Sequence, residues 1–121
     1  MTDHSPAAVV QRQLDAYNQR DIDALLATYG EHARQFEFPA NLAATGTAQI
    51  RERMSPRLQE PDLHARLVQR AVMGNIVIDQ EVVTRNFPEG IFTVDVVAIY
   101  EVAEGKIQSA TVQVTNKRPK A

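Results

Sequence analysis

Hydrophobic and polar residues alternate through the second half of the chain in four long runs. A period of two is typical of strands that bury one face of a sheet. The predicted strands are His64–Met73, Ile76–Phe87, Ile91–Val102 and Lys106–Thr115. Tight turns join them at Gly74-Asn75, Pro88-Glu89-Gly90 and Ala103-Glu104-Gly105. The pattern therefore predicts a long β-meander.

The first half of the chain has helical spacing instead. Ser5-Pro6 is a typical helix start, and Val10, Leu14 and Tyr17 follow at one-turn intervals. Asp21 begins a second predicted helix that stops at Gly30. A short edge strand, 34–38, ends at Pro39, and a loop, 40–46, leads into a third helix with Ile50, Met54 and Leu58 on one face. Pro56 should kink or end this third helix.

Helices followed by a meander predict an α+β fold, with three N-terminal helices packed on one face of a strongly curved antiparallel sheet. The chain has 121 residues, which suits a single domain spanning 1–121. We expect residues 1–4 and 116–121 to form flexible tails. Such a sheet encloses a concave pocket between the two layers.

Pairing across the first hairpin predicts which side chains face this pocket. If Gly74-Asn75 is a two-residue turn, Met73 lies opposite Ile76 and pairing continues outward. Gln69 and Gln80 then share a mostly apolar face, which should point inward. Arg70 and Asp79 share the charged opposite face, together with Glu81, and should face solvent or a partner. A shift of one residue would exchange the two faces.

Composition excludes several classes of function. The net charge of −2 gives no reason to expect a nucleic-acid or membrane-surface partner. The chain has no cysteine, its three histidines lack metal-ligand spacing, and it has no glycine loop for phosphate. We therefore expect no metal and no cofactor. No apolar run is long enough to span a membrane and the N-terminus does not resemble a signal peptide, so a cytoplasmic location is the default.

Several phrases, in their order along the chain, resemble the nuclear transport factor 2-like superfamily. Within it, the SnoaL-like and ketosteroid-isomerase-like proteins are the most similar. The phrases are Asp21-Ile22-Asp23-Ala24-Leu25-Leu26-Ala27-Thr28-Tyr29, Phe36-Glu37-Phe38-Pro39, Gly46-Thr47-Ala48-Gln49-Ile50, Val97-Ala98-Ile99-Tyr100-Glu101-Val102 and Gly105-Lys106-Ile107. The resemblance implies a cone-shaped α+β barrel that is usually dimeric. It does not imply one activity, because function depends on the site.

The resemblance also identifies the positions that carry catalysis in ketosteroid isomerases. The general base precedes a proline, which places it at Phe38 here. The two oxyanion donors fall at Gln13 and Ala98. A phenyl ring cannot accept a proton and an alanine cannot stabilise an oxyanion, so the usual isomerase mechanism is not expected. Tyr29 matches a supporting pocket tyrosine.

Glu37 is the weak candidate for a catalytic residue. It alternates with Phe36 and Phe38, so it faces solvent if the two rings face the pocket. A bulge near Pro39 would instead turn Glu37 inward and make it a general base with a raised pKa.

The predicted pocket is largely apolar and suits a small hydrophobic ligand. We expect its lining to be Tyr17, Tyr29, Phe36, Phe38, Met54, Gln69, Gln80, Val96, Ala98, Tyr100 and Val112. The first hypothesis is a SnoaL-like binding protein of unassigned activity. The second is an isomerase, cyclase or hydrolase of a polyketide-, steroid- or terpenoid-like substrate, with Glu37 or a tyrosine as acid or base. A carboxylate that faces the pocket would favour the enzyme over the binding protein. A third possibility is a purely structural dimer module, which a cavity filled by side chains would indicate.

A homodimer is also expected, because the outer face of the sheet should be apolar. The residues assigned to that face are Val68, Val72, Val77, Val83, Val97 and Ile99. A two-fold symmetric interface would remove this area from water.

Overall fold

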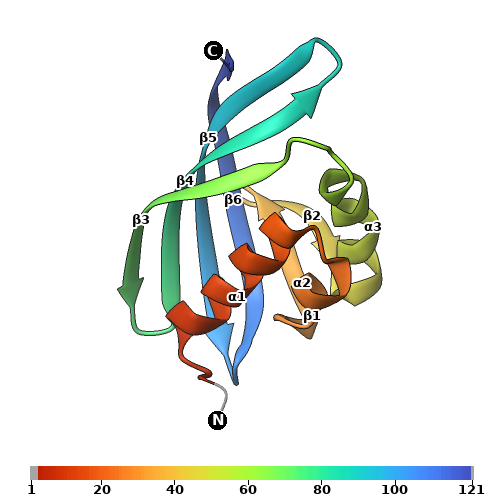
Figure 1. Cartoon of the computed structure of the whole chain (residues 1–121). Helices are drawn as coiled ribbons and strands as arrows, with labels where there is room; N and C mark the ends of the chain where they lie inside the picture. The colour runs from red at the N-terminus through yellow and green to blue at the C-terminus, as the bar shows by residue number, and fades with distance from the viewer. Residues whose placement is uncertain (1–2, 121) are drawn as a thin grey trace.

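Three helices and six strands make up the computed structural model, which describes residues 3–120 (Figure 1). The helices precede the four long strands, as expected. Their bounds are α1 Pro6–Gln19, α2 Ile22–Leu26 and α3 Gly46–Leu58. The strands are β1 Tyr29–Glu37, β2 Asn41–Thr45, β3 His64–Met73, β4 Ile76–Phe87, β5 Gly90–Ala103 and β6 Lys106–Pro119.

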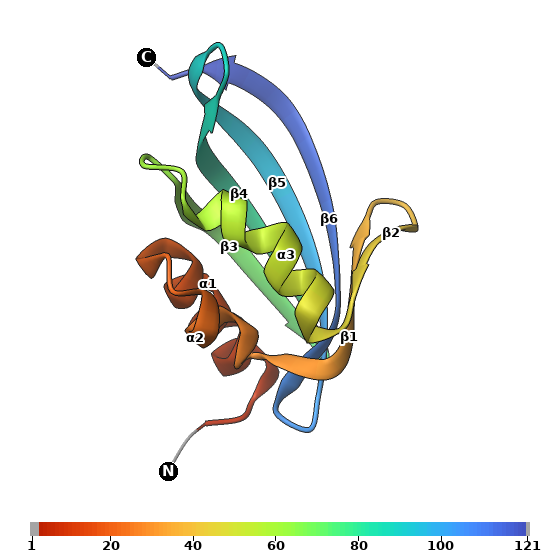
Figure 2. The ribbon, with the colours of Figure 1, turned by 90° about the vertical axis from the view of Figure 1, so that its right-hand side faces the viewer.

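The strands form one curved sheet in the order β2-β1-β6-β5-β4-β3. Figure 2 shows the three helices on its concave side, and within residues 3–120 no helix covers the opposite side. The predicted α+β architecture is confirmed. The sheet is mixed rather than wholly antiparallel, because β1 runs parallel to β6. Strand β2 occupies part of the segment that was expected to be a loop.

Local sequence signals define the helix ends. The Ser5 hydroxyl accepts a hydrogen bond from the Ala8 N–H at 3.4 Å, and the Asp21 carboxylate accepts one from the Ala24 N–H at 3.0 Å. Helix α2 ends at Leu26, earlier than predicted from Gly30. Helix α3 continues through Pro56 and ends two residues later.

The first hairpin has the predicted strand pairs but the opposite facing. Met73 pairs with Ile76 and Arg70 with Asp79. However, Asp79 is completely buried and the Arg70 side chain is only 15% exposed, whereas Gln80 points to solvent. The prediction that Gln69 and Gln80 face the pocket was wrong. Both faces of β4 are rich in apolar residues, so local alternation did not distinguish inside from outside.

A bulge in β3 changes the facing within that strand. The register shifts between Leu67 and Gln69, so Ala65 pairs with Val83 and Leu67 with Glu81. Ala65 is therefore buried on the inner face while Gln69 is exposed. A bulge adds one unpaired residue and reverses the alternation beyond it.

The chain ends pack more closely than predicted. Strand β6 continues through Pro119, which pairs with Phe92, so residues 116–119 are not a tail. The backbone oxygen of Asp3 accepts a hydrogen bond from Arg12 at 2.6 Å. Residues 1–2 and 121 lie outside the described part. No helix within residues 3–120 is long and apolar enough to cross a membrane.

Candidate functional site

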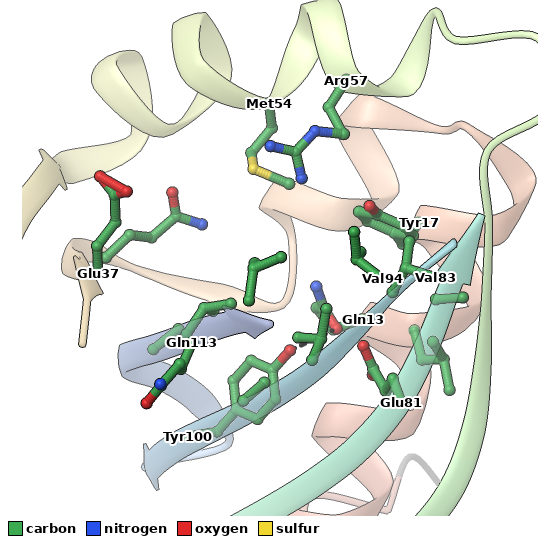
Figure 3. A pocket seen from close by; sticks show the side chains of 18 of the residues that line it. Gln13, Tyr17, Glu37, Met54, Arg57, Glu81, Val83, Val94, Tyr100 and Gln113 are labelled. Carbon is green, nitrogen blue, oxygen red and sulfur yellow. Dashed lines mark hydrogen bonds between the residues drawn. The ribbon is translucent and has the colours of Figure 1, made fainter. Parts of the chain in front are cut away.

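A cavity of about 430 Å³ lies between the helices and the concave face of the sheet (Figure 3). Its volume is within the range of small-molecule sites. Helices α1 and α3 contribute one wall, and β1, β4, β5 and β6 contribute the other. The space is therefore not filled by the protein's own side chains.

Eight of the predicted lining residues reach this cavity: Tyr17, Tyr29, Phe38, Met54, Val96, Ala98, Tyr100 and Val112. Three do not line it. Gln69 and Gln80 are exposed because the facing of the hairpin is reversed, and Phe36 is half-buried outside the cavity beneath the Arg34 guanidinium. Tyr17 of α1 and Val96, Ala98 and Tyr100 of β5 are buried on the cavity side.

Glu81 is the buried carboxylate of the cavity wall. It projects from β4, and its side chain is almost completely removed from bulk water (Figure 3). Within residues 3–120 no side chain or backbone N–H donates a hydrogen bond to it, yet its oxygens are not sealed from the cavity. Burial, followed by the negative charge of Asp79, raises the pKa of Glu81 to about 7, against a weaker opposing effect of Arg70.

Asp79 lies two residues before Glu81 on the same face of β4. Arg70 holds it through two parallel hydrogen bonds, from Nε to Oδ1 at 2.7 Å and from Nη2 to Oδ2 at 2.9 Å. The same guanidinium donates to the Gln11 side chain of α1 at 2.9 Å. The guanidinium is therefore committed to Asp79 and Gln11 and donates no hydrogen bond to the Glu81 carboxylate.

Neutral phenols and amides surround Glu81. Burial raises the pKa of Tyr29 to about 12 and raises those of Tyr17 and Tyr100 as well. Tyr100 Oη donates to Gln13 Oε1 at 3.3 Å, and Gln35 Nε2 donates to Tyr29 Oη at 3.3 Å. At neutral pH these phenols are uncharged, and the Tyr17 and Tyr29 hydroxyls, unlike that of Tyr100, can still donate a hydrogen bond to an oxygen that gains charge.

The cavity is more polar than predicted. Arg53 and Arg57 of α3 and Arg85 of β4 line it, in addition to the carboxylate, amide and phenol groups. Glu37 also lines it, but from an exposed position at the cavity rim, next to Phe38 and opposite Val112 of β6. Glu37 is therefore a residue of the entrance rather than a buried base.

Sequence reasoning missed Glu81, because the facing of β4 depends on the exact length of the second turn. In the second hairpin Phe87 pairs with Gly90, which places Glu81 opposite Val96 and Asp79 opposite Ala98. Val96 and Ala98 were already predicted to face inward. The three-residue turn predicted at Pro88-Glu89-Gly90 would instead have paired Phe87 with Ile91 and placed Glu81 opposite Val97, on the outer face.

Comparison with known families identifies the chain. A model of the SnoaL-like domain matches residues 10–110. The chain belongs to the SnoaL-like domain family. This assignment confirms the resemblance found in the sequence. Comparison with curated proteins gives no match for this SnoaL-like chain.

Solved structures confirm the nuclear transport factor 2-like fold of this SnoaL-like protein. An uncharacterised cystatin-fold protein from Novosphingobium aromaticivorans superposes with a TM-score of 0.82 at 22% identity, covering 89% of this chain and 97% of that one. A putative SnoaL-like polyketide cyclase from Jannaschia gives 0.77 at 17%, covering 90% and 84%. An epoxide hydrolase of the LEH-like type from Mycobacterium tuberculosis gives 0.76 at 14%, covering 90% and 81%. At these identities the likeness concerns the fold alone.

The three positions that align with the catalytic residues of ketosteroid isomerases lie in different parts of the cavity in this SnoaL-like protein. Phe38 is 52% exposed at the cavity entrance, while Gln13 and Ala98 are buried in its wall. The carboxylate with access to the cavity's interior comes instead from β4, as Glu81. Within residues 3–120 no group of three or more His, Cys, Asp or Glu side chains is arranged to hold a metal ion.

Proposed function

We propose that this SnoaL-like protein binds a small organic molecule in the cavity and catalyses a proton transfer within it, with Glu81 as the general base. The observation that carries the proposal is the buried Glu81 carboxylate, which faces the cavity without a hydrogen-bond donor among residues 3–120. A catalytic base is most effective when its pKa lies near the working pH. Glu81 meets this condition, with a pKa raised to about 7.

The proposed chemistry needs no group beyond the side chains of the cavity. The Glu81 carboxylate removes a proton from the carbon next to a substrate carbonyl, and the electron pair of the broken C–H bond moves onto the carbonyl oxygen. Neutral donors, including the Tyr17 phenol and the Gln13 amide, stabilise this oxyanion. Protonated Glu81 then returns the proton to the same or another carbon. Two proteins of similar fold are described as an epoxide hydrolase and a putative polyketide cyclase. Their descriptions support a catalytic role for a cavity in this fold.

The test is hydrogen–deuterium exchange at the carbon next to the carbonyl of butyrophenone, followed by NMR in heavy water. We expect the wild-type protein to catalyse this exchange, with a rate that increases as pH rises through about 7. Glu81→Gln should slow it by roughly 100- to 10,000-fold, because the amide cannot accept the proton. The matched control is Glu101→Gln, an exposed glutamate on neighbouring β5.

Two results would contradict catalysis by Glu81. One is exchange by the wild-type protein no faster than in buffer, which would leave a binding role. The other is exchange by Glu81→Gln at the wild-type rate.

We also propose that the protein is a homodimer through the outer face of the sheet. Two of the residues predicted there, Val77 and Val83, are buried inside instead. Ile78 and Val97 are 40% and 42% exposed on the helix-free side, next to Ile99. Sedimentation velocity at micromolar concentration should show a dimer, and Val97→Glu should shift it to monomer. A wild-type monomer would refute this assembly.

A further inference from the structure

Two arginines from one face of α3 reach the cavity wall opposite Glu81. Arg53 and Arg57 are one helical turn apart, with Met54 beside them. Figure 3 shows Met54 and Arg57 extending into the cavity from α3, while Glu81 and Tyr100 approach from the sheet. Like charges at this spacing repel each other, and partial removal from water increases the cost of keeping both charged.

Among residues 3–120, no carboxylate lies within hydrogen-bond distance of either arginine. Arg53 Nη1 donates to the side-chain amide oxygen of Gln35 at 2.9 Å, which is a neutral partner. For Arg57, the carboxylate partner within residues 3–120 is Glu60, and the separation from Nε to Oε2 is 3.9 Å. That distance is too long for a hydrogen bond.

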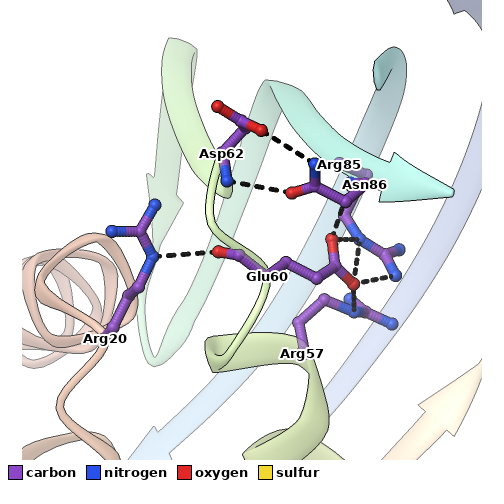
Figure 4. Close-up of polar contacts among 6 residues, drawn as sticks. All are labelled: Arg20, Arg57, Glu60, Asp62, Arg85 and Asn86. Carbon is purple, nitrogen blue, oxygen red and sulfur yellow. Dashed lines mark hydrogen bonds and ion pairs between the residues drawn. The ribbon is translucent and has the colours of Figure 1, made fainter. Parts of the chain in front are cut away.

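Glu60 is already occupied by other donors (Figure 4). Arg85 donates to it from Nη2 at 2.7 Å and from Nε at 2.8 Å, and the Asn86 N–H donates at 2.9 Å. Burial opposes ionisation of Glu60, but these hydrogen bonds prevail and lower its pKa. Among residues 3–120, Arg53 and Arg57 are therefore the cations of the cavity wall without a carboxylate at hydrogen-bond distance, whereas Arg85 holds Glu60 through Nη2 and Nε.

We propose that the substrate carries a carboxylate, which Arg57 binds together with Arg53 on the α3 side of the cavity. The guanidinium geometry matches a carboxylate and allows two parallel hydrogen bonds. The apolar body of the substrate would contact Met54, Val94 and Val96, and its carbonyl would point toward Glu81. This inference rests on the proposed function for the role of Glu81, but the anion site itself does not depend on catalysis. It replaces the expected purely hydrophobic ligand with an amphipathic anion.

The test compares 4-oxo-4-phenylbutanoate with its methyl ester, two molecules that differ in one charge. Binding is measured by NMR titration near pH 7. We expect the wild-type protein to prefer the acid by at least about tenfold. Arg57→Gln should abolish most of this preference, and Arg57→Lys should retain only part of it, because lysine keeps the charge but not the forked geometry.

The matched control is Arg51→Gln. It removes the same charge from the same helix, but Arg51 lies outside the cavity and pairs with Asp23 at 2.8 Å. This variant should keep the wild-type preference. If Arg57→Gln does not fold, the reduced preference of Arg57→Lys decides the question. Equal binding of acid and ester, failure of both to bind, or an unchanged preference in a folded Arg57 variant would overturn the anion site.

Exchange next to the ketone of the bound acid separates this inference from the proposed function. Arginine-dependent binding without exchange would preserve the anion site and contradict catalysis by Glu81. The opposite result is also possible: butyrophenone exchanges in a Glu81-dependent reaction, but the protein does not prefer the acid over the ester. That result would support the proposed function and refute the anion site.

Discussion

Replacing Arg70 by methionine is expected to lower the free energy of unfolding by about 3–5 kcal/mol. Asp79 is completely buried, and Arg70 satisfies both of its oxygens. Methionine fills similar space but leaves a charged carboxylate in the interior without a partner. Urea denaturation at pH 7, monitored by circular dichroism, measures the loss.

A surface pair provides the control for this prediction. Arg118 and Asp95 form an ion pair at 3.0 Å whose side chains are both about 40% exposed. Arg118→Met should therefore cost less than about 1 kcal/mol. The double variant Arg70→Met with Asp79→Leu should recover most of the lost unfolding free energy, because it also removes the buried carboxylate that has no partner. A cost below about 1 kcal/mol for Arg70→Met alone would show that Asp79 does not need this partner.

Replacing Glu81 by glutamine should stabilise the protein at high pH and have little effect at low pH. The pKa of Glu81 rises from the ordinary 4.5 to about 7 in the folded state. The folded protein therefore binds more protons than the unfolded chain between these values, and its stability falls as pH rises through this window. Each pKa unit corresponds to about 1.4 kcal/mol, so the full effect above pH 7 is about 3 kcal/mol.

The measurement is the difference in unfolding free energy between Glu81→Gln and wild type at pH 4 and at pH 8. We expect this difference to shift by about 3 kcal/mol in favour of the variant between the two conditions. Other titrating groups, such as Glu60, change the unfolding free energy of both proteins by similar amounts, so their effects largely cancel in the difference. The control Glu101→Gln should show no such shift. A difference that does not vary with pH would mean that Glu81 ionises normally.

The sequence was sufficient to predict the layers of the fold. The spacing of Val10, Leu14 and Tyr17 and the glycine turns between the strands identified the elements because these signals are local. The parallel pairing of β1 with β6 was beyond local reasoning, since it joins segments about 75 residues apart. The same holds for β2, a five-residue strand that gains its partner from β1.

The candidate site was predicted less completely than the fold. Tyr17, Tyr29 and Tyr100 are apolar enough for the buried faces of their elements to be identified from periodicity. An ionisable residue such as Glu81 is usually expected at the surface, so its burial was not predicted. The next two residues, Val82 and Val83, are both apolar but point to opposite faces of the sheet, so alternation could not identify the buried face. The burial of Asp79 depends on its ion pair with Arg70, nine residues earlier on β3. The sequence pattern around Asp79 does not show that this pair points to the inside of the sheet.

The role of Glu81 as general base is tested most directly by titration of its carboxyl carbon with ¹³C NMR, with Glu81→Gln used to assign its signal. The central claim is that this carboxyl faces the cavity in an environment that holds a proton near neutral pH. We expect a midpoint near pH 7 in the free protein. A midpoint near the ordinary value of 4.5 would contradict it, because a carboxyl with that pKa would be a weak base for the proposed proton transfer.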